Sequence, residues 1–596
     1  MNKKFIEKIK SSSLAQAFLL NGAFLLCAIL FCDIKYEVSD DFMMEAVLSG
    51  AFGQGYNAHL LFSNIFLGYA LKILYMLIPV VSWYFVFQIS VCFFSLAAAT
   101  YVILEHNTKP VGLLFSFLLV TFFSDDVYIL PQFTKAAALA ICAGGVLFLY
   151  GLWECEGKKK VISLIGGFIL ILCGSLIRFS CIYVAGGFLI GLFCKYVWDR
   201  YRKYDWKTIQ KNGWHLKIIS RVLYCALVII AMFLLWATSE VIWLQHPDYA
   251  EYKNYSRLRS SVVDMKSYGY DSVAEEFEAI GLDKTDYQMI ASWNFIEESQ
   301  YSMELLEEVA QIKKDCHKAK MSEPWALWNA LVNREYWTYM PVAGIVLMLL
   351  LYCLLKKKKP RYAFGQILII MGYLVYFAYR GRQVYRVEYG VFVSAAICIA
   401  STIQCGRINA TMKRMAKYLV VMLGICKIPL YLPDMNYVTM TEQEYIAYTV
   451  NTLRDSADYD VKKYGIDVYS NPAFGELVST MENDTEHYYL VDFQSGIQLL
   501  YFNYKPWIRV EQGYFQNYSY LGGVDTHHPA KKYTWSLKGI DEENPYKDLV
   551  KDFIYVVDIK YHTTKYNYLK EHYYPDLRAE LVADIDGFYI WKYYTQ

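Results

Sequence analysis

Eleven apolar runs, each long enough to cross the hydrocarbon core of a bilayer as a helix, limit how this chain can fold. Hydrophobic residues make up 56% of its 596 positions. A soluble protein does not carry so many long apolar runs. The fold class is therefore a multi-span α-helical membrane protein with about eleven transmembrane helices. The runs cover residues 14–32, 82–104, 110–124, 133–152, 161–177, 182–198, 218–237, 339–355, 362–379, 388–404 and 418–432.

One further apolar run, 60–78, contains Asn64 and Lys72, which would both lie at lipid depth if this run crossed the membrane. Four basic connections and the Lys-rich N-terminus all fall on the cytoplasmic side only when 60–78 does not cross. We therefore expect an amphipathic helix on the outer face, a cytoplasmic N-terminus and an extracytoplasmic C-terminus. A crossing helix would instead move every later basic loop outside. The basic connections are 158–160, 199–217, 356–361 and 407–417.

This topology predicts a polytopic membrane domain, 1–432, and an extracytoplasmic α/β domain, 433–596. The membrane domain carries two long outer loops, 33–81 and 238–338. In the second loop, apolar residues at helical spacing predict helices over 272–280, 284–295 and 302–318, with Asp283 and Ser302 as N-caps. The last domain shows strand-like runs at 488–492, 553–558 and 588–593, and helical patterns at 442–464 and 493–501.

Charge and cysteine content exclude several classes of function. The formal net charge is +1, and no basic domain or recognised motif supports nucleic-acid binding. Most of the 14 cysteines lie in apolar runs and none follows Cys426, so we expect no disulfide framework. The sequence identifies no cofactor and leaves a divalent metal open. The Lys-rich start lacks a convincing cleavage site, so Leu14–Phe31 is interpreted as a retained first span.

Charged residues gather at the predicted outer ends of the spans. A carboxylate there can take a proton from an acceptor hydroxyl, while another orients the acceptor or binds a metal. Clustered guanidiniums suit a phosphate or pyrophosphate. The set therefore predicts transfer of a group from a lipid phosphate to a hydroxyl, in one shared outer pocket. The acidic members are Asp40, Asp41, Glu45, Asp125 and Asp126, and the basic members are Arg178, Arg380, Arg382 and Arg386.

Plainer interpretations stand beside this one. Paired carboxylates at span ends are often solvated caps, Arg178 could snorkel to the interface, and Glu388 could simply pair with Arg386. His59, just before the amphipathic run, is either a ligand-binding side chain or an interfacial polar tip. The aromatic residues of the last domain, such as Trp507 and Tyr514, fit the core of a small domain better than a glycan site.

The first part of the chain resembles the opening of the GT-C membrane glycosyltransferases. The resemblance is carried by a first span, the outer pair Asp40–Asp41, the segment Glu45-Ala-Val-Leu-Ser-Gly-Ala-Phe52, and Asn57-Ala-His59-Leu60 before an amphipathic segment. It covers chiefly residues 14–150, together with the plan of many spans and a soluble C-terminal domain. That superfamily includes protein mannosyltransferases, aminoarabinose transferases and oligosaccharyltransferases, which use polyprenyl-phosphate-linked donors.

The resemblance implies a catalytic carboxylate at Asp40 or Asp41 and a second acidic position at Asp125 or Asp126. His59 matches a His-Pro element of the family, except that Leu60 replaces the proline. The implied partners are a polyprenyl-phosphate-linked sugar, a glycan or glycolipid acceptor and membrane lipid. The implied reaction is an inverting transfer in the synthesis of a cell-envelope polysaccharide or glycolipid.

Two other classes remain open on the sequence. A polysaccharide polymerase or ligase also uses outer arginines on lipid pyrophosphates, but it would depend less on an early acidic pair. A transporter or flippase predicts ionisable residues near the middle of several spans. In this chain the charged residues gather at the ends of the spans instead.

Overall fold

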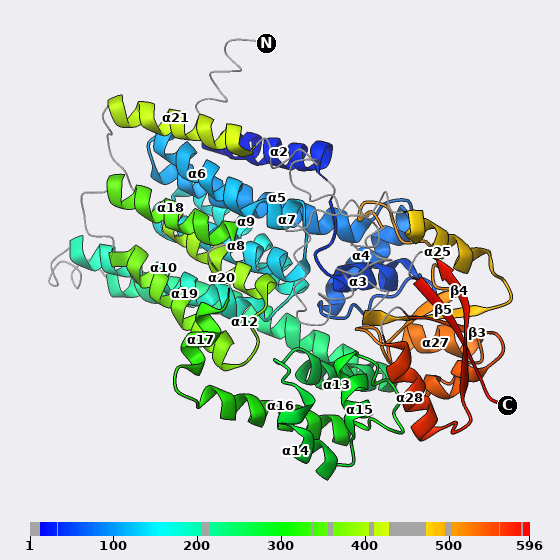
Figure 1. Cartoon of the computed structure of the whole chain (residues 1–596). Coiled ribbons are helices and arrows are strands. Elements are labelled where there is room, and N and C mark those ends of the chain that lie inside the picture. The colour runs from blue at the N-terminus through cyan, green and yellow to red at the C-terminus, as the bar shows by residue number, and fades with distance from the viewer. Residues whose placement is uncertain are drawn as a thin grey trace.

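The computed structural model combines a long helical bundle with a small C-terminal α/β domain at one end (Figure 1). This architecture confirms the predicted fold class. We call the end of the bundle that faces the α/β domain the domain end. The structure describes residues 12–596 apart from 33, 204–213, 335, 337–338, 356–360, 404–409, 428–471, 495–503, 559–560 and 586–587. The predicted domain boundary at 432–433, the predicted helix 442–464 and all but the first two residues of the predicted helix 493–501 lie outside the described residues.

Each of the eleven apolar runs overlaps a helix of the bundle. Among the described residues, seven helices are long and apolar enough to cross a membrane, namely α2, α5, α8, α9, α10, α12 and α19. The count of eleven spans and the orientation of the termini stay predictions. The bundle helices are α2 Ser13–Phe31, α5 Trp83–His106, α6 Lys109–Phe123, α8 Phe133–Glu154, α9 Gly157–Ile177, α10 Cys181–Lys203, α12 Trp214–Leu244, α18 Met340–Leu355, α19 Arg361–Tyr379, α20 Tyr385–Ser401 and α21 Ala410–Lys427.

Helix α8 lies at the centre of the bundle, and its apolar window is buried over its whole length. Gly144 on α8 and Gly167 on α9 let these two helices approach closely, because a Cβ on Gly144 would lie 2.7 Å from the Gly167 carbonyl oxygen. Helix α12 is the opposite case, with large exposed apolar side chains such as Leu234 and Ile229. Apolar side chains on the outside of such a bundle suit contact with lipid.

Three short helices lie at the domain end: α3 Ser39–Ser49, α4 Ile65–Leu77 and α7 Asp125–Tyr128. Helix α4 falls within the ambiguous run 60–78. It has 13 residues, about 20 Å of helix, which is too short to cross a bilayer. The Asn64 side chain caps α4 by accepting from the Phe66 amide at 3.1 Å. The polar residue that argued against a span therefore begins the helix.

The loop between α12 and α18 is largely helical and lies beside the α/β domain (Figure 1). Both predicted caps are confirmed: Asp283 forms a capping box at α15, and the Ser302 hydroxyl accepts from the Leu305 amide at α16. Helix α15 ends four residues earlier than predicted. The sequence did not predict α13 or α17. The elements are α13 Pro247–Val263, η1 Tyr270–Ser272, α14 Ala274–Ala279, α15 Lys284–Ala291, α16 Met303–Met321 and α17 Ala326–Val332.

The C-terminal domain contains a five-stranded sheet of order β2-β1-β3-β5-β4, in which β2, β1 and β3 are parallel. The predicted strands correspond to β1, β3 and β5. The four-residue β2 and the edge strand β4 were not predicted. The elements are α25 Pro472–Asn483, β1 Tyr488–Asp492, β2 Tyr518–Leu521, α27 Pro529–Leu537, η5 Pro545–Val550, β3 Ile554–Val557, α28 His562–His572, β4 Arg578–Ile585 and β5 Phe588–Tyr594.

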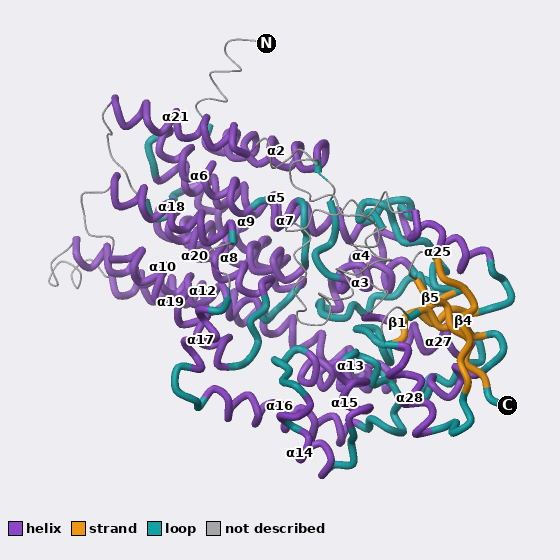
Figure 2. The backbone as a smooth tube through the Cα atoms, viewed as in Figure 1, coloured by secondary structure: helices purple, strands orange, loops and turns teal. Residues whose placement is uncertain are grey.

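The α/β domain docks on the segment between α3 and α4 (Figure 2). The amides of Gly513 and Phe515 donate to the carbonyls of Gly50 and Ala51 at 3.1 and 3.0 Å. The rings of Phe52 and Phe515 pack with their centroids 4.8 Å apart. Helix α3 is thus enclosed between the bundle and the α/β domain.

Candidate functional site

Main-chain pairing fixes the helix that carries the acidic pair. The Lys35 amide donates to the Ile129 carbonyl at 3.0 Å, and the same pairing repeats two residues further along both segments. Helix α3 then begins, and Asp40 and Asp41 lie in its first turn. The helix dipole favours negative side chains at this position. The segments that hold the two predicted acidic pairs are therefore neighbours at the domain end.

Asp41 is completely buried and its carboxylate is held by three donors. Its Oδ1 accepts from the Tyr84 hydroxyl at 2.8 Å, the Gln88 amide at 3.1 Å and the Phe133 main-chain N–H at 3.1 Å. Burial raises the pKa of Asp41 well above its usual value. These contacts tie α3 to α5 and α8, so this carboxyl positions the helix.

Asp40 is only half-buried, and within the part of the chain that the structure describes it makes no hydrogen bond or ion pair. Burial raises its pKa, while the positive charges of Arg386, Arg259 and Arg178 lower it. A half-buried carboxylate that feels the charges of three arginines but is bonded to none of them is available to a ligand. Asp40 and Asp41 thus differ in the structure, since Asp41 is held by three donors and Asp40 by none among the described residues, although the sequence predicted the same role for both.

Arg259, on α13, was not predicted as a site residue. Its side chain is 3% exposed, and within the described residues it makes no ion pair and no hydrogen bond, with the Nε atom enclosed and unpartnered. Its guanidinium lies 5.3 Å from the centroid of the Trp293 ring. Buried charges are usually paired, because an unpaired one is costly to take out of water. Arg259 is therefore the strongest candidate for binding an anionic ligand.

Arg178 lies at the end of α9, beside the first residues of α8. Its NH1 group donates to the Thr134 hydroxyl at 2.6 Å, and its guanidinium lies 5.0 Å from the centroid of the Phe133 ring. Burial and the charges of Arg382 and Arg386 lower the pKa of Arg178, whereas Asp40 raises it. The guanidinium is thus held toward the site and does not extend freely into the interface.

The arginines between α19 and α20 have different surroundings. Arg386 is half-buried and close enough to influence the pKa of Asp40. Arg382 is partly exposed and forms an ion pair with Asp264 at 2.7 Å. Arg380 is exposed, and its side chain contacts no charged partner among the described residues. Of this loop, Arg386 is the arginine whose charge acts most strongly on Asp40. Glu388 pairs with Arg334 at 3.1 Å.

In the second acidic pair, Asp126 forms an ion pair with a buried lysine. Lys135 is completely buried, and its Nζ lies 2.9 Å from Asp126 and 2.7 Å from Glu37. The Tyr385 hydroxyl also donates to Asp126, at 3.1 Å. Asp125 is buried in the short helix α7. Because Asp126 is paired and enclosed, it supports the site by fixing the loop after α6.

Glu45 is completely buried among tyrosines two turns along α3. It accepts from the hydroxyls of Tyr36 at 2.9 Å and Tyr75 at 3.3 Å. Burial raises the pKa of Glu45 to about 7, against these hydrogen bonds. This carboxyl therefore exchanges a proton near neutral pH without a cationic partner.

His59 lies away from the acidic pair, in an aromatic cluster. Its ring stacks on Tyr249 with centroids 3.7 Å apart and lies 5.0 Å from Trp243. Burial lowers the pKa of His59 to about 4. The neutral ring pairs with Asn57 through Nδ1 at 3.0 Å, and its main-chain carbonyl accepts from His528 at 3.2 Å. These contacts connect the start of α4 to the α/β domain.

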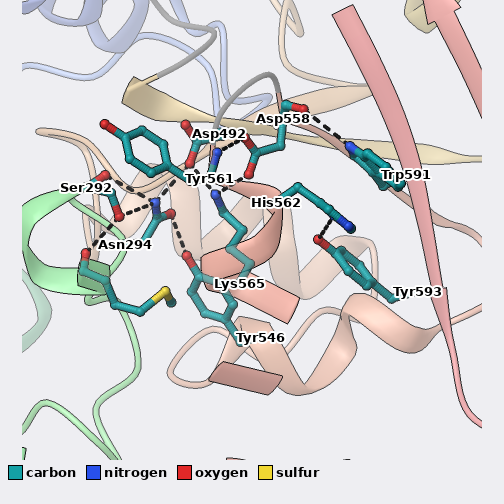
Figure 3. A network of polar contacts seen from close by, with 11 residues as sticks. Ser292, Asn294, Asp492, Tyr546, Asp558, Tyr561, His562, Lys565, Trp591 and Tyr593 are labelled. Carbon is teal, nitrogen blue, oxygen red and sulfur yellow. Dashed lines mark hydrogen bonds and ion pairs between the residues drawn. The ribbon is translucent and has the colours of Figure 1, made fainter. Parts of the chain in front are cut away.

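A second charged network lies in the α/β domain, where β1 and β3 end (Figure 3). Lys565, from α28, pairs with Asp492 and with Asp558, the latter at 2.6 Å, and all three side chains are completely buried. Asn294, from the α12–α18 loop, donates to Asp492 at 2.9 Å and accepts from the Tyr546 hydroxyl at 2.6 Å. This network joins the loop to the domain.

The groups around Asp40 do not fit a metal ion. In the described ranges, no three His, Cys, Asp or Glu side chains are grouped to hold one. The charges that act most strongly on the Asp40 carboxyl are those of Arg386 and Arg259, and positive charges repel a divalent cation. The same donor set suits an anion such as a phosphate, which accepts several N–H bonds from arginine.

Comparison with models of protein families gave no match, and comparison with curated proteins gave none either. Two solved structures are similar to the chain: ArnT from Cupriavidus metallidurans in the apo state, and ArnT bound to undecaprenyl phosphate. In each case the identity is 12%, the TM-score is 0.47, and the alignment covers 96% of this chain and 97% of the ArnT chain. At this identity and TM-score, the roles of individual residues depend on their own contacts.

Proposed function

We propose that this protein is a membrane glycosyltransferase that moves a sugar from a polyprenyl-phosphate donor to a hydroxyl of a glycan or glycolipid. The observation that carries the proposal is the unpaired carboxylate of Asp40 among the guanidiniums of Arg178, Arg259 and Arg386. One carboxylate supplies a base, and the arginines supply a site for a phosphate. Both lie at the end of an apolar bundle, where a lipid-linked substrate presents its headgroup.

The reaction follows from these two kinds of group. Asp40 takes the proton of the acceptor hydroxyl, and the oxygen attacks the anomeric carbon of the donor sugar. The bond from that carbon to the phosphate oxygen breaks, and polyprenyl phosphate leaves with the bonding electrons. Attack opposite the leaving group inverts the anomeric carbon. The arginines stabilise the negative charge that develops on the departing phosphate.

Within this proposal, the adjacent carboxyls have separate tasks. Asp40 contacts the reacting atoms, whereas Asp41 holds α3 against α5 and α8. The domain end faces the outside of the cell, since the Lys158–Lys160 turn lies at the other end of α9 from Arg178. The acceptor is then an extracytoplasmic glycan or glycolipid.

The test compares two isosteric variants, Asp40→Asn and Asp41→Asn, in the purified full-length protein. Each is incubated with an acceptor membrane extract and a panel of undecaprenyl-phosphate-linked sugars, and release of undecaprenyl phosphate is measured. We expect Asp40→Asn to lose about 10²–10⁴-fold in rate. Asp41→Asn can still accept hydrogen bonds and keeps more than about a tenth of the rate. Full activity of Asp40→Asn would falsify the assignment of the base.

A further inference from the structure

Backbone strain is concentrated where α13, the segment after α15 and the turn after β2 meet. Three residues other than glycine have a positive φ in the described part of the chain, and two of them, Trp293 (φ 65°) and His527 (φ 60°), lie at this meeting point. Such conformations are costly and persist when the surroundings enforce them, often at functional sites. We name this place the α13–β2 junction and define it by Arg259, Trp293, Tyr520 and Asp525.

The turn after β2 is pressed against Trp293. Gly522 has a φ of 84°, and a Cβ at this position would lie 2.3 Å from the Trp293 carbonyl oxygen, so only glycine fits. The Tyr252 hydroxyl, from α13, donates to the Val524 carbonyl at 2.9 Å. These contacts fix the turn, and with it Asp525, against the same face of α13 that carries Arg259.

Three polar groups of the junction are buried without a hydrogen-bond partner. They are the Oδ1 atom of Asp525, the Nε atom of Arg259 and the hydroxyl of Tyr520, in side chains that are 1%, 3% and 1% exposed. The other carboxylate oxygen of Asp525 is paired with Lys531 at 3.2 Å. A buried polar group without a partner is destabilising, and a ligand that supplies both donors and acceptors would satisfy all three.

Aromatic contacts link these groups into one set. The Arg259 guanidinium lies 5.3 Å from the centroid of the Trp293 ring, which stacks on Phe493 at 5.6 Å. The Phe493 ring in turn lies 6.3 Å from that of Tyr520. Arg259 is also near enough to lower the pKa of both Asp40 and Asp525, which burial raises. The charge of Arg259 therefore acts on both the proposed base and the junction.

We propose that the α13–β2 junction binds the sugar of the lipid-linked donor. This inference rests on the proposed function and deepens it by locating the sugar. Neighbouring hydroxyls of a sugar ring donate to Asp525, accept from Arg259 and bond to the Tyr520 hydroxyl, which satisfies all three orphaned groups. The sugar is joined directly to the phosphate, so an arginine shared with the phosphate site places the anomeric carbon beside Asp40.

The experiment compares binding of two probes to the full-length protein in detergent: undecaprenyl phosphate, and a panel of undecaprenyl-phosphate-linked hexoses and amino sugars. The wild type should bind at least one glycosylated lipid more tightly than undecaprenyl phosphate. Asp525→Asn and Tyr520→Phe should weaken binding of that glycosylated lipid, and for Asp525→Asn the loss of affinity should be about tenfold. Both variants should change the affinity for undecaprenyl phosphate by less than about twofold.

The matched control is Asp558→Asn, which also removes a buried carboxylate paired with a lysine in the α/β domain. It should leave the ratio of the two affinities unchanged, which separates sugar recognition from general loss of stability. If Asp525→Asn lowered the affinities for both probes equally, or lowered neither, the assignment of the sugar site would be overturned while the proposed function would stand. Equal wild-type affinity for every lipid of the panel would also overturn it. A wild type that binds neither probe would overturn the proposed function itself.

Discussion

Two charged clusters, one in the α/β domain and one around Asp40 at the domain end of the bundle, satisfy their charges in opposite ways. In the α/β domain, Lys565 lies between Asp492 and Asp558, and Asn294 completes the bonding (Figure 3). Around Asp40, by contrast, Arg259 has no hydrogen-bond partner among the described residues. The first cluster is closed within the protein. The second leaves its bonding capacity for something outside the chain.

This difference indicates which cluster carries function. A complete buried network fixes geometry and has no bonding capacity left for a ligand. An incomplete one costs stability and is kept when a ligand completes it. Five substitutions test the contrast, beginning with the largest expected loss of stability.

Replacing Lys565 by methionine should cause the largest loss of stability. The change leaves Asp492 and Asp558 buried side by side without their cation, which costs about 3–5 kcal/mol. Denaturant unfolding of the full-length protein in detergent, followed by near-UV circular dichroism, measures the loss. An unfolding free energy equal to that of the wild type would show that the closed network does not stabilise the domain.

Glu45 is an intermediate case, partnered by hydroxyls but by no cation. Burial raises its pKa from 4.5 to about 7, so the folded protein holds a proton that the unfolded chain releases. The contribution of Glu45 to the free energy of unfolding is fully present below about pH 4.5. It falls by up to about 3 kcal/mol as the pH rises to about 7. The difference in unfolding free energy between wild type and Glu45→Gln should follow this window, whereas a difference that is flat from pH 5 to 8 contradicts it. Taking that difference cancels the effect of His59, whose lowered pKa acts in the opposite direction.

The adjacent carboxyls of α3 repeat the contrast on a smaller scale. Asp41→Ala strands three donors, including the Tyr84 hydroxyl and the Phe133 N–H, and should destabilise the protein by about 2–3 kcal/mol. Asp40→Ala removes no hydrogen bond of the described chain and should change stability by less than about 0.5 kcal/mol. Thermal unfolding of both variants gives the comparison. Equal losses would mean that Asp40 is also held within the fold.

Arg259→Leu should have a small effect on stability, and of the opposite sign. It removes a buried charge without breaking a protein hydrogen bond, so we expect stability to rise by about 1 kcal/mol. The same variant should lose affinity for undecaprenyl phosphate. A large drop in the unfolding temperature would place Arg259 with the closed network instead.

Local patterns in the sequence were enough to predict much of the fold. Apolar runs predicted the positions of the bundle helices, and the polar residues Asn64 and Lys72 indicated that 60–78 forms a short helix beside them, which is α4. The caps Asp283 and Ser302 and the buried strands β1, β3 and β5 follow from residue types within a few positions. Strand β4 was missed because it is a largely exposed edge strand, without the apolar run of a buried one.

The site was predicted less completely, because its character depends on partners distant in sequence. Asp40 and Asp41 look alike until Tyr84 and Gln88, on another helix, bond to one of them. The arginine loop was predicted as a unit, but Asp264 engages Arg382. Arg259 carries no local signal, since what distinguishes it is the lack of a partner.

The main-chain bonds between Gly50–Ala51 and Gly513–Phe515 have a consequence for biogenesis. The ribosome synthesises every bundle helix except α2 between these partners, so the segment that follows the proposed base is made long before the residues that it pairs with. Gly513 and Phe515, which bond to this segment, are synthesised only with the last quarter of the nascent chain. A product truncated before that point would lack the main-chain partners that fix the segment between α3 and α4.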